Sequence, residues 1–199
     1  PSSPEEAREM MHYAYEISEK FEEPVLFRTT TRMNHVRGVI ELGDIKKPEG
    51  RIHFEKDVNR FVTVPSNARI RHLALLELIP KMRDEAEVSP WNKVIAPNKN
   101  TKGDLKLGII TSGVSFNYVM EVLNNVEFNV EARVLKLGMS APLPEDMISE
   151  FCQENDLVLT VEEGEAYLEE FTKAILKERE IPTQVLGKRD GHFPIPMEY

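Results

Sequence analysis

The second half of the chain predicts an α/β fold with a largely parallel sheet. Three apolar segments, at residues 105–111, 130–137 and 157–161, each precede a stretch with helical spacing of apolar residues. Strands that alternate with helices of about 10–15 residues form βαβ units, whose strands are parallel and whose crossovers are right-handed. Residues 104–199 are therefore expected to form one α/β domain.

The helices of this half have recognisable starts and ends. The first is expected from about Val114 to Asn125, and the second opens at Pro142–Asp146, where proline and acidic residues suit a first helical turn. The third is expected over Glu165–Glu180, followed by a short last strand at Thr183–Leu186. The remaining Gly187–Tyr199 is expected to be an irregular exit segment.

The N-terminal part predicts a helix and then a strand. Ser3–Glu6 is a helix start, because the serine can cap, the proline suits the first helical position and the second glutamate completes a capping-box pattern. Apolar residues recur at helical spacing as far as Phe21, and Val25–Thr31 is apolar and β-branched enough for a strand. One such αβ unit leaves its faces uncovered, so residues 1–43 need other secondary structure to complete a layer.

The middle of the chain is expected to be less regular. Arg32–Gly50 has turn residues and mixed charge and predicts a loop, and Arg60–Val64 predicts a short extended piece. A helix capped by Ser66 follows, which Pro80 should kink or interrupt because proline lacks the N–H of a helical residue. The polar, proline-containing Ser89–Lys102 is the preferred domain boundary.

Composition excludes several classes of protein. With 199 residues and a net charge of −9, the chain is long enough for one large domain or two small ones and lacks the basic face that nucleic acid requires. No apolar run approaches the roughly 18 residues of a membrane span. The single Cys152 excludes an intrachain disulfide and a cysteine-ligated cluster, is expected to be a buried core thiol, and fits a reducing, cytoplasmic location.

The most polar cluster of the chain follows the strand predicted at residues 25–31. Its candidate site residues are Arg28, Thr30, Arg32, His35 and Arg37. Arginine offers a bidentate fork to a carboxylate, and ligands of open α/β sheets usually lie at strand ends. Two interpretations stand: binding of a substrate carboxylate or cofactor, and a subunit or domain interface.

A second candidate is the turn that joins the strand at 105–111 to its helix. Ser112, Gly113 and Ser115 stand at a helix N-terminus, where free N–H groups favour anions such as phosphate. The turn lacks a Gly-x-Gly-x-x-Gly motif and a following lysine, so a structural turn with a serine cap is the preferred interpretation.

Charged pairs elsewhere are interpreted as surface. Glu162–Glu163 and Glu169–Glu170 are expected at the solvated surface or in a subunit contact, and Lys188–Arg189 is expected to be solvated. The five histidines show no spacing of the H-x-x-x-H or H-E-x-x-H kind, so no metal site is predicted.

Several of these motifs, in this order, resemble the large subunit of indolepyruvate:ferredoxin oxidoreductase, and the resemblance spans almost the whole chain. The motifs lie at Arg28–Arg32, His35–Gly38, Phe61–Arg69, Gly108–Ser115, Leu135–Pro144 and Val161–Glu170. The resemblance implies that residues 1–60 are the C-terminal part of a pyrimidine-binding-like domain, 61–103 a helix and linker, and 104–199 a domain like the transketolase C-terminal domain.

For the parent protein, the resemblance implies a thiamine-diphosphate enzyme that oxidatively decarboxylates aryl 2-oxo acids. The resemblance also implies magnesium and [4Fe-4S] clusters as cofactors of the parent protein. It implies ferredoxin and a smaller beta subunit as its partners, and an aryl-acyl-CoA as its product. This chain has no Gly-Asp…Asn motif for magnesium and diphosphate and no cysteine-rich motif, and the resemblance places the cofactor-activating glutamate upstream of Pro1.

The chain is therefore expected to be an internal fragment or a split subunit that holds no cofactor and does not catalyse alone. Its role is then structural, through contacts with the remaining domains and subunits, and it is expected to self-associate. The alternative is a stand-alone α/β module that binds a phosphate-containing ligand such as CoA at the Ser112–Ser115 turn.

Overall fold

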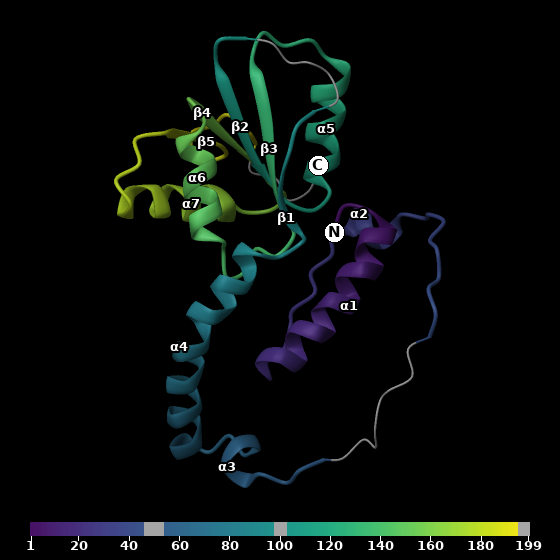
Figure 1. The fold of residues 1–199 in the computed structure, drawn as a ribbon, viewed down its shortest axis with the longest axis vertical. Coiled ribbons are helices and arrows are strands. Elements are labelled where there is room, and N and C mark those ends of the chain that lie inside the picture. Colours follow the sequence, from purple (N-terminus) through teal and green to yellow (C-terminus); the bar gives the residue numbers. More distant parts are fainter. Residues whose placement is uncertain (46–53, 98–102, 195–199) are drawn as a thin grey trace.

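The computed structural model describes residues 1–45, 54–97 and 103–194 of the 199-residue chain. A sheet with flanking helices forms one end of the molecule, and helices α1 to α4 lie beyond it (Figure 1). The strands are β1 (Asn92–Ile95), β2 (Lys106–Thr111), β3 (Glu131–Leu137), β4 (Leu157–Val161) and β5 (Gln184–Leu186). The helices are α1 (Pro4–Phe21), α2 (Thr31–His35), α3 (Val58–Phe61), α4 (Pro65–Glu87), α5 (Ser115–Asn125), α6 (Glu145–Gln153) and α7 (Tyr167–Glu178).

The sheet confirms an α/β fold with a mostly parallel arrangement. Its strand order is β1-β3-β2-β4-β5, and only β1 runs antiparallel, against β3. From β2 the chain goes to β3 on one side, and from β3 it returns to β4 on the other side of β2. The connections thus diverge between β2 and β4, and ligands of open α/β sheets usually bind at the carboxyl ends of such a pair of strands.

The two faces of the sheet bury different clusters. Ile110 of β2 packs with the side chains of α6 and α7, whereas the neighbouring Ile109 packs with α5. This alternation follows from the pleat, which points successive side chains to opposite faces. Figure 1 shows α6 and α7 together on one side of the sheet and α5 on the other.

Most elements of the second half agree with the sequence prediction. The three helices and the strands β2 to β5 occur where they were expected, within a few residues. In the N-terminal half, α1 begins after Ser3, whose Oγ accepts a hydrogen bond from the N–H of Glu6 at 3.1 Å. The carboxylate of Glu6 bonds to Ser2 rather than to the N–H of Ser3, so the capping box is only half formed.

The strand predicted at Val25–Thr31 is wrong. Residues 24–30 form neither helix nor strand, and Thr31–His35 is the short helix α2. β-branched residues favour a strand only where a neighbouring strand pairs with them. This segment instead runs along the carboxyl ends of the sheet and lines a cavity there.

Three predictions for the middle of the chain are also corrected. Val58–Phe61 is the helix α3, capped by Asp57, where an extended piece was expected at 60–64. The helix α4 begins at Pro65, so Ser66 lies inside it rather than at its cap, and it continues past Pro80 to Glu87 without interruption, because losing one backbone hydrogen bond does not end a long helix. A kink at Pro80 stays a prediction. Part of the predicted connector forms β1, which pairs with β3.

The division into three domains stays a prediction, as does the likeness to a transketolase C-terminal domain. The parts of the loop, connector and exit segment that fall on residues 46–53, 98–102 and 195–199 lie outside the described residues. Among the helices that the structure describes, none is both long enough and apolar enough to cross a membrane.

Candidate functional site

A cavity of about 550 Å³ lies at the carboxyl ends of the parallel strands. Its walls come from α1 and the segment after it, from Trp91, and from the loops that follow β2, β3 and β4. The lining includes Arg28, Thr30, Trp91, Ser112, Gly113, Glu163 and Tyr167. Its position beside β2 and β4 and its volume are those of small-molecule sites in α/β proteins.

Three polar atoms in the wall are buried without a hydrogen-bond partner within the described part of the chain. They are the Oγ1 of Thr30, the Nε1 of Trp91 and one carboxylate oxygen of Glu163, Oε1. Buried polar groups in folded proteins nearly always have a partner, and an unpaired one costs about 1–3 kcal/mol. These atoms are themselves buried, so they mark unpaired polar groups in the residues around the cavity rather than groups that face into it.

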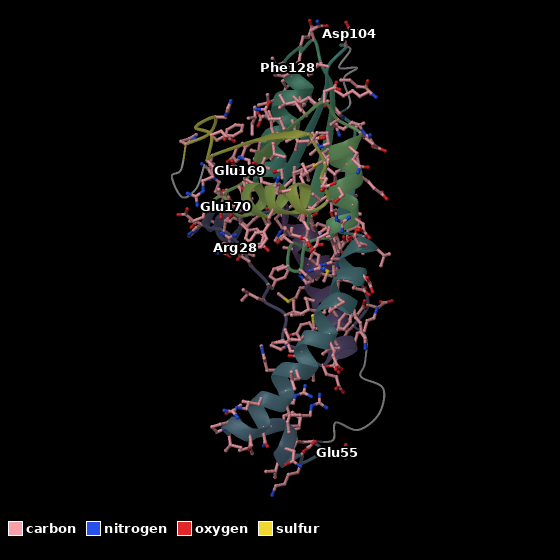
Figure 2. All side chains as sticks on the ribbon, turned by 90° about the vertical axis from the view of Figure 1, so that its left-hand side faces the viewer. Arg28, Glu55, Asp104, Phe128, Glu169 and Glu170 are labelled. Carbon is pink, nitrogen blue, oxygen red and sulfur yellow. The ribbon has the colours of Figure 1, made fainter. Side chains whose placement is uncertain are left out.

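The structure brings two of the five predicted cluster residues to the cavity. Arg28 and Thr30 line it, and the guanidinium Nη2 of Arg28 lies 3.6 Å from where a Cβ on Gly164 would be, beside the loop after β4. Figure 2 shows Arg28 on the same side of the molecule as Glu169 and Glu170 of α7. The arginine is nevertheless exposed, so it lies at the rim of the cavity.

The other three cluster residues point elsewhere. The guanidinium carbon of Arg32 lies 5.6 Å from the ring centroid of Tyr118 on α5, a cation–π distance. His35 and Arg37 are exposed on and after α2. The predicted cluster is thus divided between a cavity and a surface.

The turn between β2 and α5 has the expected geometry of a strand–helix connection. Gly113 has a left-handed φ of 57°, which a residue without a Cβ adopts at no steric cost. Ser112 and Gly113 line the cavity, whereas Ser115 is fully buried as the first residue of α5. The hydroxyls of Ser115 and Thr111 are buried and have no partner in the described chain.

The chain's own first residues cover this turn. The side-chain amide of Asn117 on α5 donates to the carbonyl of Ser2 at 2.7 Å. The buried Lys136, at the end of β3, donates to Ser2 Oγ at 2.7 Å and to Glu6 Oε1 at 2.5 Å. Its Nζ also lies 4.3 Å from the ring centroid of Phe116.

Glu6 is therefore the counter-ion of the one buried lysine near this turn that the described ranges contain. Burial alone would raise the pKa of the Glu6 carboxyl, but hydrogen bonds from Lys136 and Ser2 outweigh it and lower the pKa. The carboxylate thus stays charged at neutral pH. A phosphate at the turn would have to compete with it for the charge of Lys136.

Two acidic residues predicted at the surface are buried instead. Glu162 accepts hydrogen bonds from the N–H groups of Leu168 at 2.7 Å and Glu169 at 3.0 Å, so its carboxylate caps the first turn of α7. Burial raises the pKa of Glu162, although these bonds and the charge of Lys188 oppose the rise. The signal in the sequence was an acidic residue that follows a strand and precedes a helix by a few residues.

Glu169 and Lys188 complete this buried charge cluster. Glu169 is fully buried; its Oε1 pairs with Lys173 Nζ at 2.6 Å and its Oε2 accepts from the N–H of Arg189 at 2.9 Å. Lys188, expected to be solvated, is buried and donates to the carbonyl of Gly164 at 2.6 Å. These bonds fix the loop after β4, which forms one wall of the cavity.

The side chains of the described residues do not provide the ligands of an iron–sulfur cluster. Cys152 is the only cysteine, it lies in the core between sheet and helices, and burial raises the pKa of its thiol to about 12. In the described ranges, no three or more histidine, cysteine, aspartate or glutamate side chains are placed to share a metal ion.

Comparison with known proteins identifies relatives over the whole chain. No protein-family model matches it. It is 39% identical over 199 residues to the "Indolepyruvate oxidoreductase subunit IorA" of Methanothermobacter thermautotrophicus, which covers 100% of this chain and 31% of that protein. The proteins of the same name from Thermococcus kodakarensis (40% identity, 94% of this chain, 29% of the relative) and Archaeoglobus fulgidus (34%, 100% and 30%) match similarly. The chain thus spans about a third of the length of these curated relatives.

Proposed function

Because the chain belongs over its full length to the family of indolepyruvate oxidoreductase subunits IorA, we propose that it is one segment of the large subunit of a 2-oxoacid oxidoreductase. In this proposal the segment is structural. It supplies an α/β layer and contact surfaces, and it does not catalyse by itself.

The cofactors of the proposed enzyme belong to other parts of the assembly. Thiamine diphosphate with magnesium and [4Fe-4S] clusters would serve decarboxylation of an aryl 2-oxo acid and electron transfer to ferredoxin. A smaller beta subunit completes the proposed enzyme. The single buried cysteine supports this division, because a [4Fe-4S] cluster needs several thiolate ligands.

The observation that carries the structural role is the apolar surface of α4. Ile70, Leu73 and Leu76 lie at helical spacing on this helix and are 67%, 63% and 50% exposed. Figure 2 shows the part of the molecule around Glu55, α3 and α4 reaching away from the sheet. Contiguous exposed apolar residues of this kind mark protein–protein contacts, so this arm is proposed to pack against other domains or subunits.

The test compares the chain alone with the complete enzyme. Indolepyruvate-dependent reduction of ferredoxin in the presence of CoA is expected from the assembled subunits and absent from the 199-residue chain. Circular dichroism of the isolated chain checks that its inactivity is not a failure to fold. Turnover by the isolated, folded chain would refute the proposal.

A second candidate function is binding of CoA or another phosphate-containing ligand at the Ser112–Ser115 turn. The buried, partnerless hydroxyls of Thr111 and Ser115 beside the N-terminus of α5 favour it. The pairing of Lys136 with Glu6 opposes it.

Isothermal titration with CoA separates the two candidates. The first candidate expects no heat of binding to the chain alone. The second expects binding that the Ser115→Ala variant weakens, since this change removes one hydroxyl without leaving a polar group unpaired. Binding that Ser115→Ala leaves unchanged would exclude the turn as the site.

A further inference from the structure

The exposed face of α4 combines an apolar stripe with one charge of each sign. The stripe consists of Ile70, Leu73 and Leu76, which are all at least half exposed. Arg69 and Glu77 are exposed beside the two ends of this stripe. At 100° per residue, both charged residues lie within about 40° of the direction of Leu73, so all five side chains belong to one face of the helix.

This face points away from α1. On the side toward α1, Arg71 Nη2 lies 3.6 Å from Glu23 Oε1, just after α1, and Glu85 pairs with Lys20. Around the axis of α4, Arg71 lies about 160° and Glu85 about 120° from Leu73. Figure 1 shows α1 to the right of α4. The face centred on Leu73 is therefore free to contact a partner.

The face is symmetric about Leu73 in a way that suits a second copy of itself. Three positions before and after Leu73 stand the apolar Ile70 and Leu76, and four positions before and after it stand the oppositely charged Arg69 and Glu77. In two antiparallel helices related by a two-fold axis at Leu73, a residue before Leu73 in one copy lies at the same height as the residue equally far after it in the other. Ile70 then meets Leu76, and Arg69 meets Glu77, once on each side of the axis.

This match is the property that a two-fold interface requires, since such an interface uses one patch that is complementary to itself. The charges also select one register. An antiparallel pair centred on Arg69 sets this arginine against its own copy, and a pair centred on Glu77 does the same with the glutamate. Opposed like charges disfavour a register, whereas the register centred on Leu73 pairs opposite charges.

We propose that α4 is a self-association surface, at which two copies of the subunit pack their α4 helices antiparallel across Leu73. This inference rests on the proposed role of α4 as a contact surface, and it identifies the partner as a second copy rather than a different domain or subunit. The apolar stripe supplies the contact, and the pairs of Arg69 with Glu77 fix its direction and register.

The test places a photo-crosslinking amino acid, p-benzoylphenylalanine, at position 73 of the full-length subunit that contains this segment. Subunits labelled with ¹⁵N are mixed with unlabelled ones, so that a crosslink between two copies shows one heavy and one light peptide. Trypsin releases His72–Lys81, and irradiation is expected to join this peptide to the same peptide of the other copy.

The matched control is the same amino acid at the exposed position of Asp84, also on α4. In the proposed register, this position lies about 15 Å farther along the helix than the nearest end of the partner's His72–Lys81, so the yield of product with that peptide is expected to be at least about fivefold lower.

Charge reversal at two exposed positions tests the register. In subunits that carry the crosslinker at position 73, Arg69→Glu and Glu77→Arg should each lower the yield between copies about fivefold, because each opposes like charges. The double variant Arg69→Glu/Glu77→Arg restores opposite charges and should return the yield to within about twofold of the original. Far-UV circular dichroism checks that each variant is folded.

Four outcomes would overturn the proposal. They are crosslinks from position 73 only within one copy or to a different subunit, equal yields from positions 73 and 84, no crosslink from position 73, and a double variant that stays as weak as the single ones. A crosslink from position 73 to another domain or to a different subunit would still support the structural role of α4, whereas turnover by the isolated chain would refute that role.

Discussion

At the scale of single residues, Gly108 sets how closely α6 approaches the sheet. A Cβ at this position of β2 would lie 2.8 Å from Cε1 of Phe151 and 3.0 Å from Cγ of Asn155. Phe151 is nearly fully buried in the cluster between the sheet and helices α6 and α7. A side chain of any size at position 108 must therefore move the ring or the helix.

We expect Gly108→Ala to destabilise the fold by about 1–3 kcal/mol, the usual cost of overpacking a well-filled core. Urea unfolding followed by circular dichroism measures the change. The Gly108→Ala/Phe151→Leu double variant should lose less stability than the two single variants lose together, because the shortest contact of the new Cβ is with the ring of Phe151. Strict additivity would show that the ring does not limit this position.

At the scale of elements, Asn92 joins the end of α4 to the end of β3. Its side-chain Nδ2 donates to the carbonyls of Ala86 and Met139, both at 2.9 Å. Its Oδ1 accepts from the N–H groups of Gly138 and Met139, also at 2.9 Å. The buried amide thus uses two donors and both lone pairs of its oxygen, and it holds β1 against β3 at the point where α4 ends.

Asn92→Asp is expected to cost about 3 kcal/mol or more, because the new oxygen would face two carbonyl oxygens and the charge would be buried. The measurement is the urea midpoint at pH 7. The exposed Asn129 offers a matched control, since Asn129→Asp should change stability by less than about 0.5 kcal/mol. Equal effects of the two variants would contradict this role of Asn92.

A second link between elements joins α1 to α4. Glu85 of α4 accepts a hydrogen bond from Tyr13 Oη at 2.9 Å and pairs with Lys20, both on α1. The hydrogen bond from Lys20 is the main reason that the pKa of Glu85 lies below its ordinary value of 4.5. A carboxyl with a lowered pKa stabilises the fold above its unfolded-state pKa, and this contribution is lost as pH falls through the folded-state pKa.

The prediction concerns Glu85→Gln, which keeps an acceptor for Tyr13 but removes the ion pair. We expect a loss of about 1 kcal/mol at pH 7, which stays constant down to about pH 4.5 and shrinks below it. Urea unfolding of both proteins between pH 7 and pH 3.5 measures this difference. Glu19→Gln on the exposed side of α1 is the control, and a pH-independent difference for Glu85→Gln would contradict the assignment.

Local sequence patterns predicted the elements whose ends are marked by capping residues, prolines or the limits of an apolar run. Helix α1 follows a serine cap, and helix α6 follows a proline and has acidic residues in its first turn. The strands β2 and β4 are apolar runs, of which β2 is buried over its last four residues and β4 is buried on one face and half-buried on the other. The strand β1 has only four residues, and its pairing depends on the amide of Asn92, which no local pattern reveals. The strand prediction for Val25–Thr31 was wrong because the segment has the composition of a strand but no neighbouring strand with which to pair.

At the scale of the whole molecule, the site was only partly predictable. Arg28 and Thr30 were found because polar residues were sought next to an expected strand end, and they do line the cavity. The buried roles of Glu162 and Lys188 were missed, because two residues 26 positions apart in the sequence meet only when β4 and β5 pair side by side. Charged residues in a sequence are normally predicted to be exposed, because they are rarely buried unless the tertiary structure pairs them with other charged or polar groups.

The sheet end of the molecule and helix α4 differ in how much of their apolar surface is buried. The sheet end has continuous buried clusters on both faces, whereas α4 buries Ala86 near its end and exposes apolar residues along its middle. A helix gains most of its stability from packing an apolar face. If the chain is a segment of the proposed enzyme, a partner domain or subunit is expected to cover and stabilise this arm.

Leu73→Glu should leave the sheet intact and weaken the association of the full-length subunit about tenfold or more, since burying a leucine contributes about 1.5–3 kcal/mol. Leu73 is 63% exposed, so the change removes no contact of the sheet. Sedimentation of the assembled enzyme measures the association, and far-UV circular dichroism checks the fold. His72→Glu, at the neighbouring exposed position, adds the same carboxylate without removing an apolar side chain. If the two variants weaken association equally, charge rather than apolar contact governs this surface, and if neither does, α4 is not an interface.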